Sequence, residues 1–355
     1  MLRLLMIIAG FVLSTTANSA VILQYHHVSD DTPASTSISP ELFAAHMAYV
    51  EELGYEVVPL SELVQSLREG KTIADDVVAI TFDDGYADNM AAIKSEIAPR
   101  GWPFTIFVPP LLIDQRIRGY MSWDELNELK DLGGELSNHS WEHNHLAARL
   151  PDESDEAWLV RFREDLLKAE ARIEEMTGES HRILAYPYGE FSPEMLEVLS
   201  EEGFAAVGQQ SGAVGEFSEL GHLPRFPFGG PYGTVEDFHT KVRTLAMPVA
   251  SVALKDNGEA LDSHILDYGS AWPQAHITLR EDSGIRISGI NCFASGLGAQ
   301  TVVAEGEHGF SVLADGQLQK GRSRYNCTAG SNQRHRFYWF SVPVVQLDQD
   351  GNWVD

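Results

Sequence analysis

Short runs rich in β-branched and aromatic residues recur between residues 21 and 247, and helical stretches separate most of them. A strand followed by a helix and a second strand builds a parallel sheet, because the helix carries the chain back to the starting edge. We predict strands at these runs: Val21–Val28, Tyr55–Leu60, Val77–Phe82, Phe104–Val108, Gly134–Ser137, Arg182–Tyr186, Phe204–Val207 and Leu223–Phe228. So many units favour a (β/α) barrel, although periodicity alone does not separate it from an open sheet.

Three of the intervening helices carry recognisable start and stop signals. A serine before the first turn can accept a backbone N–H, proline fits the first turn, and glycine fits the position after the last turn. These signals stand at Ser39-Pro40 with Gly54, at Ser122 with Glu125 (a capping box), and at Ser192-Pro193 with Gly203.

The pattern of apolar and polar residues changes after Met247. From 250 to 355 the sequence alternates apolar and polar residues in short runs separated by Gly, Asn and Asp turns, which predicts a small all-β module of sandwich type. Cys292 and Cys327 both lie in this module and are the only cysteines of the chain. In an exported protein such a pair indicates a disulfide that stabilises the fold by about 3–4 kcal/mol, with two buried thiols as the alternative.

Residues 1–20 have the layout of an export signal. Arg3 precedes an apolar run from Leu4 to Leu13, and small polar residues follow up to Ala20. We expect cleavage between Ala17 and Ala20 and an exported protein, periplasmic or secreted. The apolar run is short for a bilayer span, so we expect no stable span after cleavage, with a retained N-terminal anchor as the alternative.

The chain is strongly acidic, with 25 Lys+Arg against 52 Asp+Glu and a formal net charge of −27. Such a surface repels phosphate backbones and anionic headgroups, which argues against a nucleic-acid partner and against docking on anionic lipid. Neutral or cationic partners remain open, and so does a role of the charge in solubility alone. The oligomeric state is not determined by the sequence.

Polar residues cluster where three of the predicted strands end. Asp83 and Asp84 follow the first of these strands, in Thr81-Phe82-Asp83-Asp84-Gly85. Adjacent carboxylates repel each other and are costly to bury, so either they serve a site or they open an ordinary turn.

His139 and His143 follow a second strand, in His139-Ser140-Trp141-Glu142-His143. One helical turn would place both imidazoles on one side. Together with an aspartate they complete a two-histidine, one-carboxylate set that leaves metal positions open. A third strand leads into Tyr186-Pro187-Tyr188-Gly189, a tight loop whose backbone N–H groups could face a developing oxyanion.

In this order and at this spacing, the TFDDG, HSWEH and YPYG segments resemble the polysaccharide deacetylases of carbohydrate esterase family 4, over about residues 21–247. The resemblance implies a distorted (β/α) barrel with its site at the strand C-termini. It implies Asp83 as the catalytic base, the backbone N–H of Tyr188 as the oxyanion donor, and a divalent metal, usually zinc. The metal ligands that it implies are Asp84, His139 and His143.

Two departures from the family pattern concern positions that the family uses. The arginine that usually precedes the proline of the third motif is replaced by Tyr186, so Arg225 is the candidate for orienting Asp83. The usual late Leu-x-His motif, which supplies the general acid, has no counterpart. His26 and His27 offer an alternative acid or a substrate contact, and strand alternation allows only one of them to face inward. The Tyr-His pattern resembles the exported poly-N-acetylglucosamine deacetylases, which favours His26.

The sequence therefore predicts a hydrolase that removes N-acetyl groups from an N-acetylglucosamine polymer, using a metal-activated water and the Asp83 base. The same site could serve peptidoglycan amino sugars or O-acetyl esters of xylan. A non-catalytic carbohydrate-binding protein with a degenerate barrel is the alternative from another class.

Overall fold

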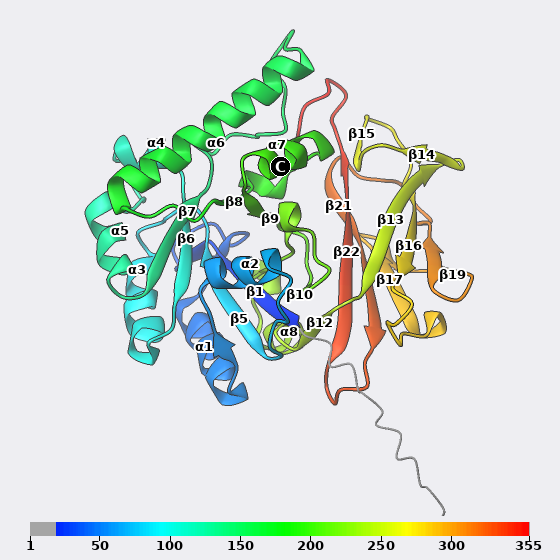
Figure 1. Ribbon diagram of the computed structural model, residues 1–355, viewed down its shortest axis with the longest axis horizontal. Coiled ribbons are helices and arrows are strands. Elements are labelled where there is room, and N and C mark those ends of the chain that lie inside the picture. The colour runs from blue at the N-terminus through cyan, green and yellow to red at the C-terminus, as the bar shows by residue number, and fades with distance from the viewer. Residues whose placement is uncertain (1–18, 355) are drawn as a thin grey trace, which may run out of the picture.

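The computed structural model describes residues 19–354 and shows a strand–helix barrel beside an all-β module (Figure 1). The barrel sheet has the strand order β10-β1-β5-β6-β7-β8-β9, with β4 paired to β5 and β11 paired to β1. Its strands are β1 Ser19–Tyr25, β4 Glu56–Val57, β5 Val77–Phe82, β6 Phe104–Val108, β7 Gly134–Asn138, β8 Ile183–Ala185, β9 Ala205–Val207, β10 Val214–Gly215 and β11 Phe226–Pro227. A separate pair, β2 His27–Val28 and β3 Ser37–Ile38, lies outside this sheet.

The segment around Arg225 joins the two ends of the barrel sheet. Leu223 bridges Val207 of β9, and Phe226 pairs in parallel with Leu23 of β1. The predicted strand Leu223–Phe228 is reduced to two residues of ladder, since Pro224 and Pro227 have no N–H to donate. The prediction of a (β/α) barrel is confirmed, and its curled sheet is distorted at this joint.

Helices cover the outside of the sheet, and α2 closes one end of the interior. The helices are α1 Pro40–Leu53, α2 Leu60–Arg68, α3 Asn89–Ala92, α4 Pro110–Asp114, α5 Trp123–Lys130, α6 Asp155–Thr177, α7 Pro193–Glu201 and α8 Val235–Lys241. The predicted caps are confirmed: Ser39, Ser122 and Ser192 each accept a backbone N–H, and Gly54 ends α1 with a φ of 68°.

The prediction of a strand over Tyr55–Leu60 is wrong at its second half. Only Glu56–Val57 pairs with β5, and Leu60 begins α2 instead. The physical reason is helical spacing: Leu60, Leu63 and Val64 recur on one face of α2 and pack among the inward-facing strand residues of the barrel interior.

The C-terminal module consists of two sheets packed on a shared apolar core. One sheet contains β12 Thr244–Ala246, β15 Ile265–Leu266, β17 Ile290–Ala294, β18 Gly298–Gln300, β21 Gly321–Gly330 and β22 Phe337–Gln346. The other contains β13 Val249–Asp256, β14 Glu259–Leu261, β16 Gln274–Leu279, β19 Val302–Glu305 and β20 Gly309–Val312. Cys292 and Cys327 lie opposite each other on β17 and β21 and form the predicted disulfide.

The barrel and the module meet along β12 and β22. Strand β12, which the sequence assigned to the barrel, pairs in parallel with β22 of the module. Ser19 of β1 accepts a hydrogen bond from the backbone N–H of Ala246 on β12, 2.9 Å away. β12 therefore connects the first strand of the barrel to the last strand of the chain, which explains why the two bodies lie against each other in Figure 1.

Strand β1 also extends further toward the N-terminus than expected, because Ser19 and Ala20 both belong to it. The rest of the predicted export signal, residues 1–18, lies outside the described residues. Among residues 19–354, no helix combines the length and apolar character needed to cross a bilayer.

Candidate active site

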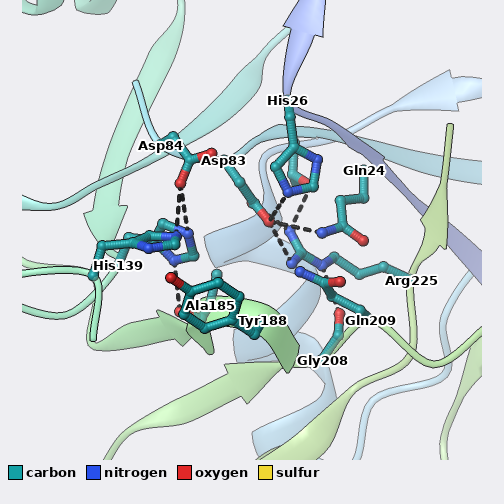
Figure 2. Close-up of polar contacts among 12 residues, drawn as sticks. Gln24, His26, Asp83, Asp84, His139, Ala185, Tyr188, Gly208, Gln209 and Arg225 are labelled. Carbon is teal, nitrogen blue, oxygen red and sulfur yellow. Dashed lines mark hydrogen bonds and ion pairs between the residues drawn. The ribbon is translucent and has the colours of Figure 1, made fainter. Parts of the chain in front are cut away.

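Asp84, His139 and His143 converge at the C-terminal ends of β5 and β7 (Figure 2 labels Asp84 and His139). Nε2 of His139 lies 3.1 Å from Oδ1 of Asp84, and Nε2 of His143 lies 3.0 Å from the same oxygen. The three candidate ligand atoms lie within 4.8 Å of one another. The two-histidine, one-carboxylate set expected from the motifs is thus assembled in space.

The donor set fits a divalent cation. Oδ1 of Asp84 is buried and has no hydrogen-bond partner of good geometry among residues 19–354, which is costly unless something else occupies it. Nδ1 of His139 lies 2.7 Å from the carbonyl of Ala185, an acceptor that requires Nδ1 to carry the proton. The lone pair of Nε2 is therefore left for the cation, as in many metal-binding histidines.

The two histidines do not lie on one helical turn, as the spacing suggested. Residues 139–143 form a loop in which Ser140 and His143 have positive φ angles of 63° and 59°. Asn138 stabilises this loop, since its side chain accepts the N–H of Ser140 and donates to the carbonyl of Leu166. Non-glycine residues rarely adopt positive φ and cluster at functional sites when they do.

Asp83 lies next to this cluster, on the inward face of the barrel, and is fully buried. Arg225 donates two hydrogen bonds to it, from Nη1 to Oδ1 at 2.7 Å and from Nη2 to Oδ2 at 2.8 Å. Gln24 donates a third bond to Oδ2, also at 2.7 Å (Figure 2). Such charge-assisted contacts fix both the position and the ionised state of the carboxylate.

The pKa values of both aspartates lie below the ordinary range. Burial raises the pKa of Asp83, but the Arg225 guanidinium, with smaller help from His139 and His26, lowers it further. Burial likewise raises the pKa of Asp84, and the imidazoles of His139 and His143 outweigh it. Both groups are therefore carboxylates at neutral pH, one able to accept a proton and the other able to bind a cation.

His26 faces the site and His27 does not. Nε2 of His26 lies 3.8 Å from Oδ2 of Asp83, and its side chain is partly exposed at the rim. His27 instead contacts Asp88 at 2.7 Å and stacks on the ring of Tyr86, with 3.7 Å between ring centroids. The alternation of β1 explains this difference, because Gln24 and His26 share the inward face.

Tyr188 lies beside His143, in the short turn that follows β8. Its ring stacks on His145 with 4.0 Å between centroids and meets the edge of His143 at 4.9 Å. Its φ of 58° places it in the left-handed region. Tyr186, at the position where the family usually has arginine, points away from the site and donates to the carbonyl of Gly221.

Several site residues were not expected from the sequence. Gln24 could have been found, because it lies two positions before His26 on the same face of β1. His145 pairs with the buried Glu190 at 2.8 Å, a contact for which the sequence after His143 gave no specific signal. Arg322 of the C-terminal module contacts the Tyr188 carbonyl, and nothing in the sequence pattern indicates that approach.

Comparison with known proteins agrees with this geometry. The sequence profile of the family described as "Polysaccharide deacetylase" matches residues 70–207, which contain Asp83, Asp84, His139 and His143. The match covers less than half of the chain. Gln24 and His26 near the end of β1, and Arg225 at the barrel joint, lie outside the matched residues.

Two curated relatives align with the deacetylase domain and its flanks. YxkH of Bacillus subtilis, whose name assigns it to the polysaccharide deacetylases, is 24% identical over 183 residues, or 52% of this chain and 61% of the relative. The poly-β-1,6-N-acetyl-D-glucosamine N-deacetylase of Escherichia coli K12 is 21% identical over 246 residues, or 59% of this chain and 36% of the relative. The chain thus spans less than two thirds of the length of each relative.

Solved structures share the barrel fold. The Streptococcus pyogenes deacetylase PplD, in complex with acetate, superposes with a TM-score of 0.56 at 19% identity, covering 64% of this chain and 99% of PplD. IcaB from Ammonifex degensii superposes with a TM-score of 0.54 at 23% identity, covering 61% of this chain and 94% of IcaB. At this identity the likeness shows the fold of the deacetylase domain.

Proposed function

We propose that this protein is an exported, metal-dependent hydrolase that removes N-acetyl groups from an N-acetylglucosamine polysaccharide. The observation that carries the proposal is the pairing of Asp83, held by two hydrogen bonds from Arg225, with the adjacent Asp84–His139–His143 cluster. A carboxylate base beside a cation site is an arrangement that can hydrolyse an unactivated amide. The names of the E. coli relative and of the family point to the same chemistry.

Asp84, His139 and His143 would hold the cation, and their histidine-rich donor set favours zinc. A bound cation would supply the Lewis acidity that polarises the acetyl carbonyl and acidifies water. Asp83 accepts the proton of the attacking water, and Arg225 with Gln24 keeps its carboxylate aimed into the pocket. The backbone N–H of Tyr188 donates to the oxyanion that develops on the acetyl carbonyl.

The leaving nitrogen needs a proton before the amide bond breaks, and His26 is the group we assign to deliver it. Burial lowers the pKa of His26, against the opposing effect of Asp83, so the ring is neutral before the reaction. Its Nε2 is only 3.8 Å from Oδ2 of Asp83. A proton taken up by Asp83 thus has a short path through the imidazole to the leaving nitrogen.

Acetate release from defined substrates tests the proposal. The panel comprises β-1,6- and β-1,4-linked N-acetylglucosamine oligomers, peptidoglycan fragments and acetylxylan, each with and without a chelator. We expect release from at least one N-acetylglucosamine oligomer, loss of release with the chelator, and recovery on adding back zinc. If acetate is released only from peptidoglycan fragments or only from acetylxylan, that material is the substrate and not an N-acetylglucosamine polymer.

A non-catalytic carbohydrate-binding protein is the second candidate function. It predicts binding of the same oligomers without acetate release and without stoichiometric metal. The bidentate Arg225–Asp83 contact argues against it, since burying an ion pair is expensive and a binding module needs no ionised base in its core. Binding of these oligomers, with neither stoichiometric metal nor acetate release across the panel, would establish the binding alternative.

A further inference from the structure

Two arginines of the C-terminal module reach across to the loops of the barrel site. Arg322 and Arg324 lie on the same face of β21. Nη1 of Arg322 donates to the carbonyl of Tyr188 and, at 3.0 Å, to Oε1 of Gln209. Nη1 of Arg324 donates to the backbone carbonyl of Gln209 at 3.1 Å. The module therefore bonds directly to the residue whose N–H we assign to the oxyanion.

The two barrel loops that receive these bonds are themselves in contact. Gly189, which follows Tyr188, has a φ of 73°, and a Cβ at that position would lie 2.8 Å from the side chain of Gln209. On the other side, Nε of Arg225 donates to the carbonyl of Gly208 at 2.9 Å (Figure 2). The segment around Gln209 thus lies between the arginines of the module and the arginine that holds Asp83.

The charges around Arg322 and Arg324 indicate that these side chains serve as hydrogen-bond donors to the barrel loops. Burial lowers the pKa of Arg324, and the neighbouring Arg322 guanidinium lowers it further. In a chain with 52 acidic residues, both guanidinium groups nevertheless donate to carbonyl and amide oxygens. Two adjacent guanidinium groups repel each other and destabilise the contact between barrel and module. If this contact served packing alone, apolar side chains would stabilise it more.

We propose that Arg322 is a positioning residue for the deacetylation site, supplied by the C-terminal module. Arg322 bonds to both the Tyr188 carbonyl and the Gln209 side chain. It thereby fixes the left-handed conformation of Tyr188, and with it the direction of the Tyr188 backbone N–H. Arg324 supports it by holding the backbone of Gln209. This inference rests on the proposed function, and it makes the C-terminal module part of the catalytic unit.

Steady-state kinetics on an N-acetylglucosamine oligomer test this role. Arg322→Ala should lower kcat by about 10- to 100-fold with KM changed less than about twofold, because a misdirected donor weakens the transition state more than substrate binding. Arg322→Lys should recover most of the loss, since an ammonium can donate to both oxygens. The matched control is Arg286→Ala, an exposed arginine of the same module, which should leave kcat unchanged.

Loop order can be measured without any turnover. Hydrogen exchange followed by mass spectrometry should show faster exchange at residues 186–191 and 208–212 in Arg322→Ala, and unchanged exchange in Arg286→Ala. This measurement separates the two proposals. If the loops exchange faster in Arg322→Ala but the wild-type protein never releases acetate, the positioning role of Arg322 is supported and the deacetylase function is rejected. Unchanged exchange in Arg322→Ala would contradict the proposal that Arg322 orders these two loops.

Two kinetic outcomes would also overturn the inference. One is a kcat for Arg322→Ala within twofold of the Arg286→Ala value. The other is a raised KM at constant kcat, which would make Arg322 a substrate contact. A double-mutant cycle with Gln209→Ala gives an independent check, because the Arg322–Gln209 contact predicts that the two substitutions are less than additive.

Discussion

Arg225 and Asp83 meet through two hydrogen bonds of 2.7 Å and 2.8 Å, although they lie 142 positions apart in the chain. Arg225 comes from the segment that joins the two ends of the barrel sheet, and Asp83 follows the central strand β5. Both side chains are fully buried. The arginine that usually accompanies the third motif of the family is replaced by Tyr186, and an arginine from another strand takes the position beside the base.

Removing Arg225 should destabilise the fold as well as the site. Arg225→Ala leaves the Asp83 carboxylate buried without its partner, and we expect a loss of about 3–5 kcal/mol in the free energy of unfolding. Urea denaturation measures it. The matched control is Arg163→Ala, since Arg163 pairs with Glu202 on the surface and should cost less than about 1 kcal/mol. Equal effects of the two substitutions would contradict the account of the buried pair.

Asp83→Asn should separate catalysis from metal binding. The substitution removes the proton acceptor, so we expect kcat to fall by at least about 10²-fold. The ligand atoms of Asp84, His139 and His143 stay in place, so stoichiometric zinc should remain by elemental analysis. His139→Ala should instead lose both zinc and activity. Wild-type turnover by Asp83→Asn would show that the base has been assigned to the wrong residue.

His46 should make the barrel less stable as the pH falls. It is fully buried between the Tyr25 hydroxyl and the carbonyl of Gly233, each 3.1 Å from a ring nitrogen, and it stacks on Phe238. Burial lowers the pKa of His46 from 6.5 to about 3. Between these values the unfolded chain binds a proton that the folded chain excludes, so stability is full above pH 6.5 and falls toward pH 3.

Comparison with His46→Gln isolates this contribution. The free energy of unfolding of the wild type should fall more steeply from pH 6.5 to pH 4 than that of the variant, by up to about 1.4 kcal/mol per pH unit. Other titrating groups, including His264, are present in both proteins and cancel in the difference. Parallel curves for the two proteins over this range would show that His46 is not the group responsible.

The mature N-terminus should lie at or before Ser19. Ala20 pairs with Val77 on one side and Val214 on the other, and Ser19 accepts the N–H of Ala246. Cleavage after Ala20 would remove these contacts, whereas cleavage after Ala17 or Asn18 keeps them. Mass spectrometry of the protein secreted by an exporting host measures the start. A mature chain beginning at Val21 would contradict this prediction, and an uncleaved chain would indicate the retained N-terminal anchor instead.

A strand could be predicted from the sequence where its flanking residues mark its ends, and not where its end depends on packing. The boundaries of β5 and β6 agree with the sequence prediction, because both are fully buried, mostly apolar runs with clear flanking signals. Asp76 and Asp83 flank β5, and Pro103 and Pro109 flank β6. The run at Tyr55–Leu60 failed, because whether Leu60 extends a strand or starts a helix depends on its packing inside the barrel. Short segments carry too little periodicity to decide such cases.

The site shows the same division. The sequence by itself determined the chemistry: which residues could bind a cation, which carboxylate could serve as a base, and that strand ends would bring them together, since parallel strands share one edge. The sequence also offered Arg225 as the residue that orients Asp83, and the structure places it there. Only the tertiary structure decided the other partners, namely Gln24 on Asp83 and Arg322 on Tyr188. Motifs record local geometry, whereas these contacts depend on how the barrel closes and how the second module packs against it.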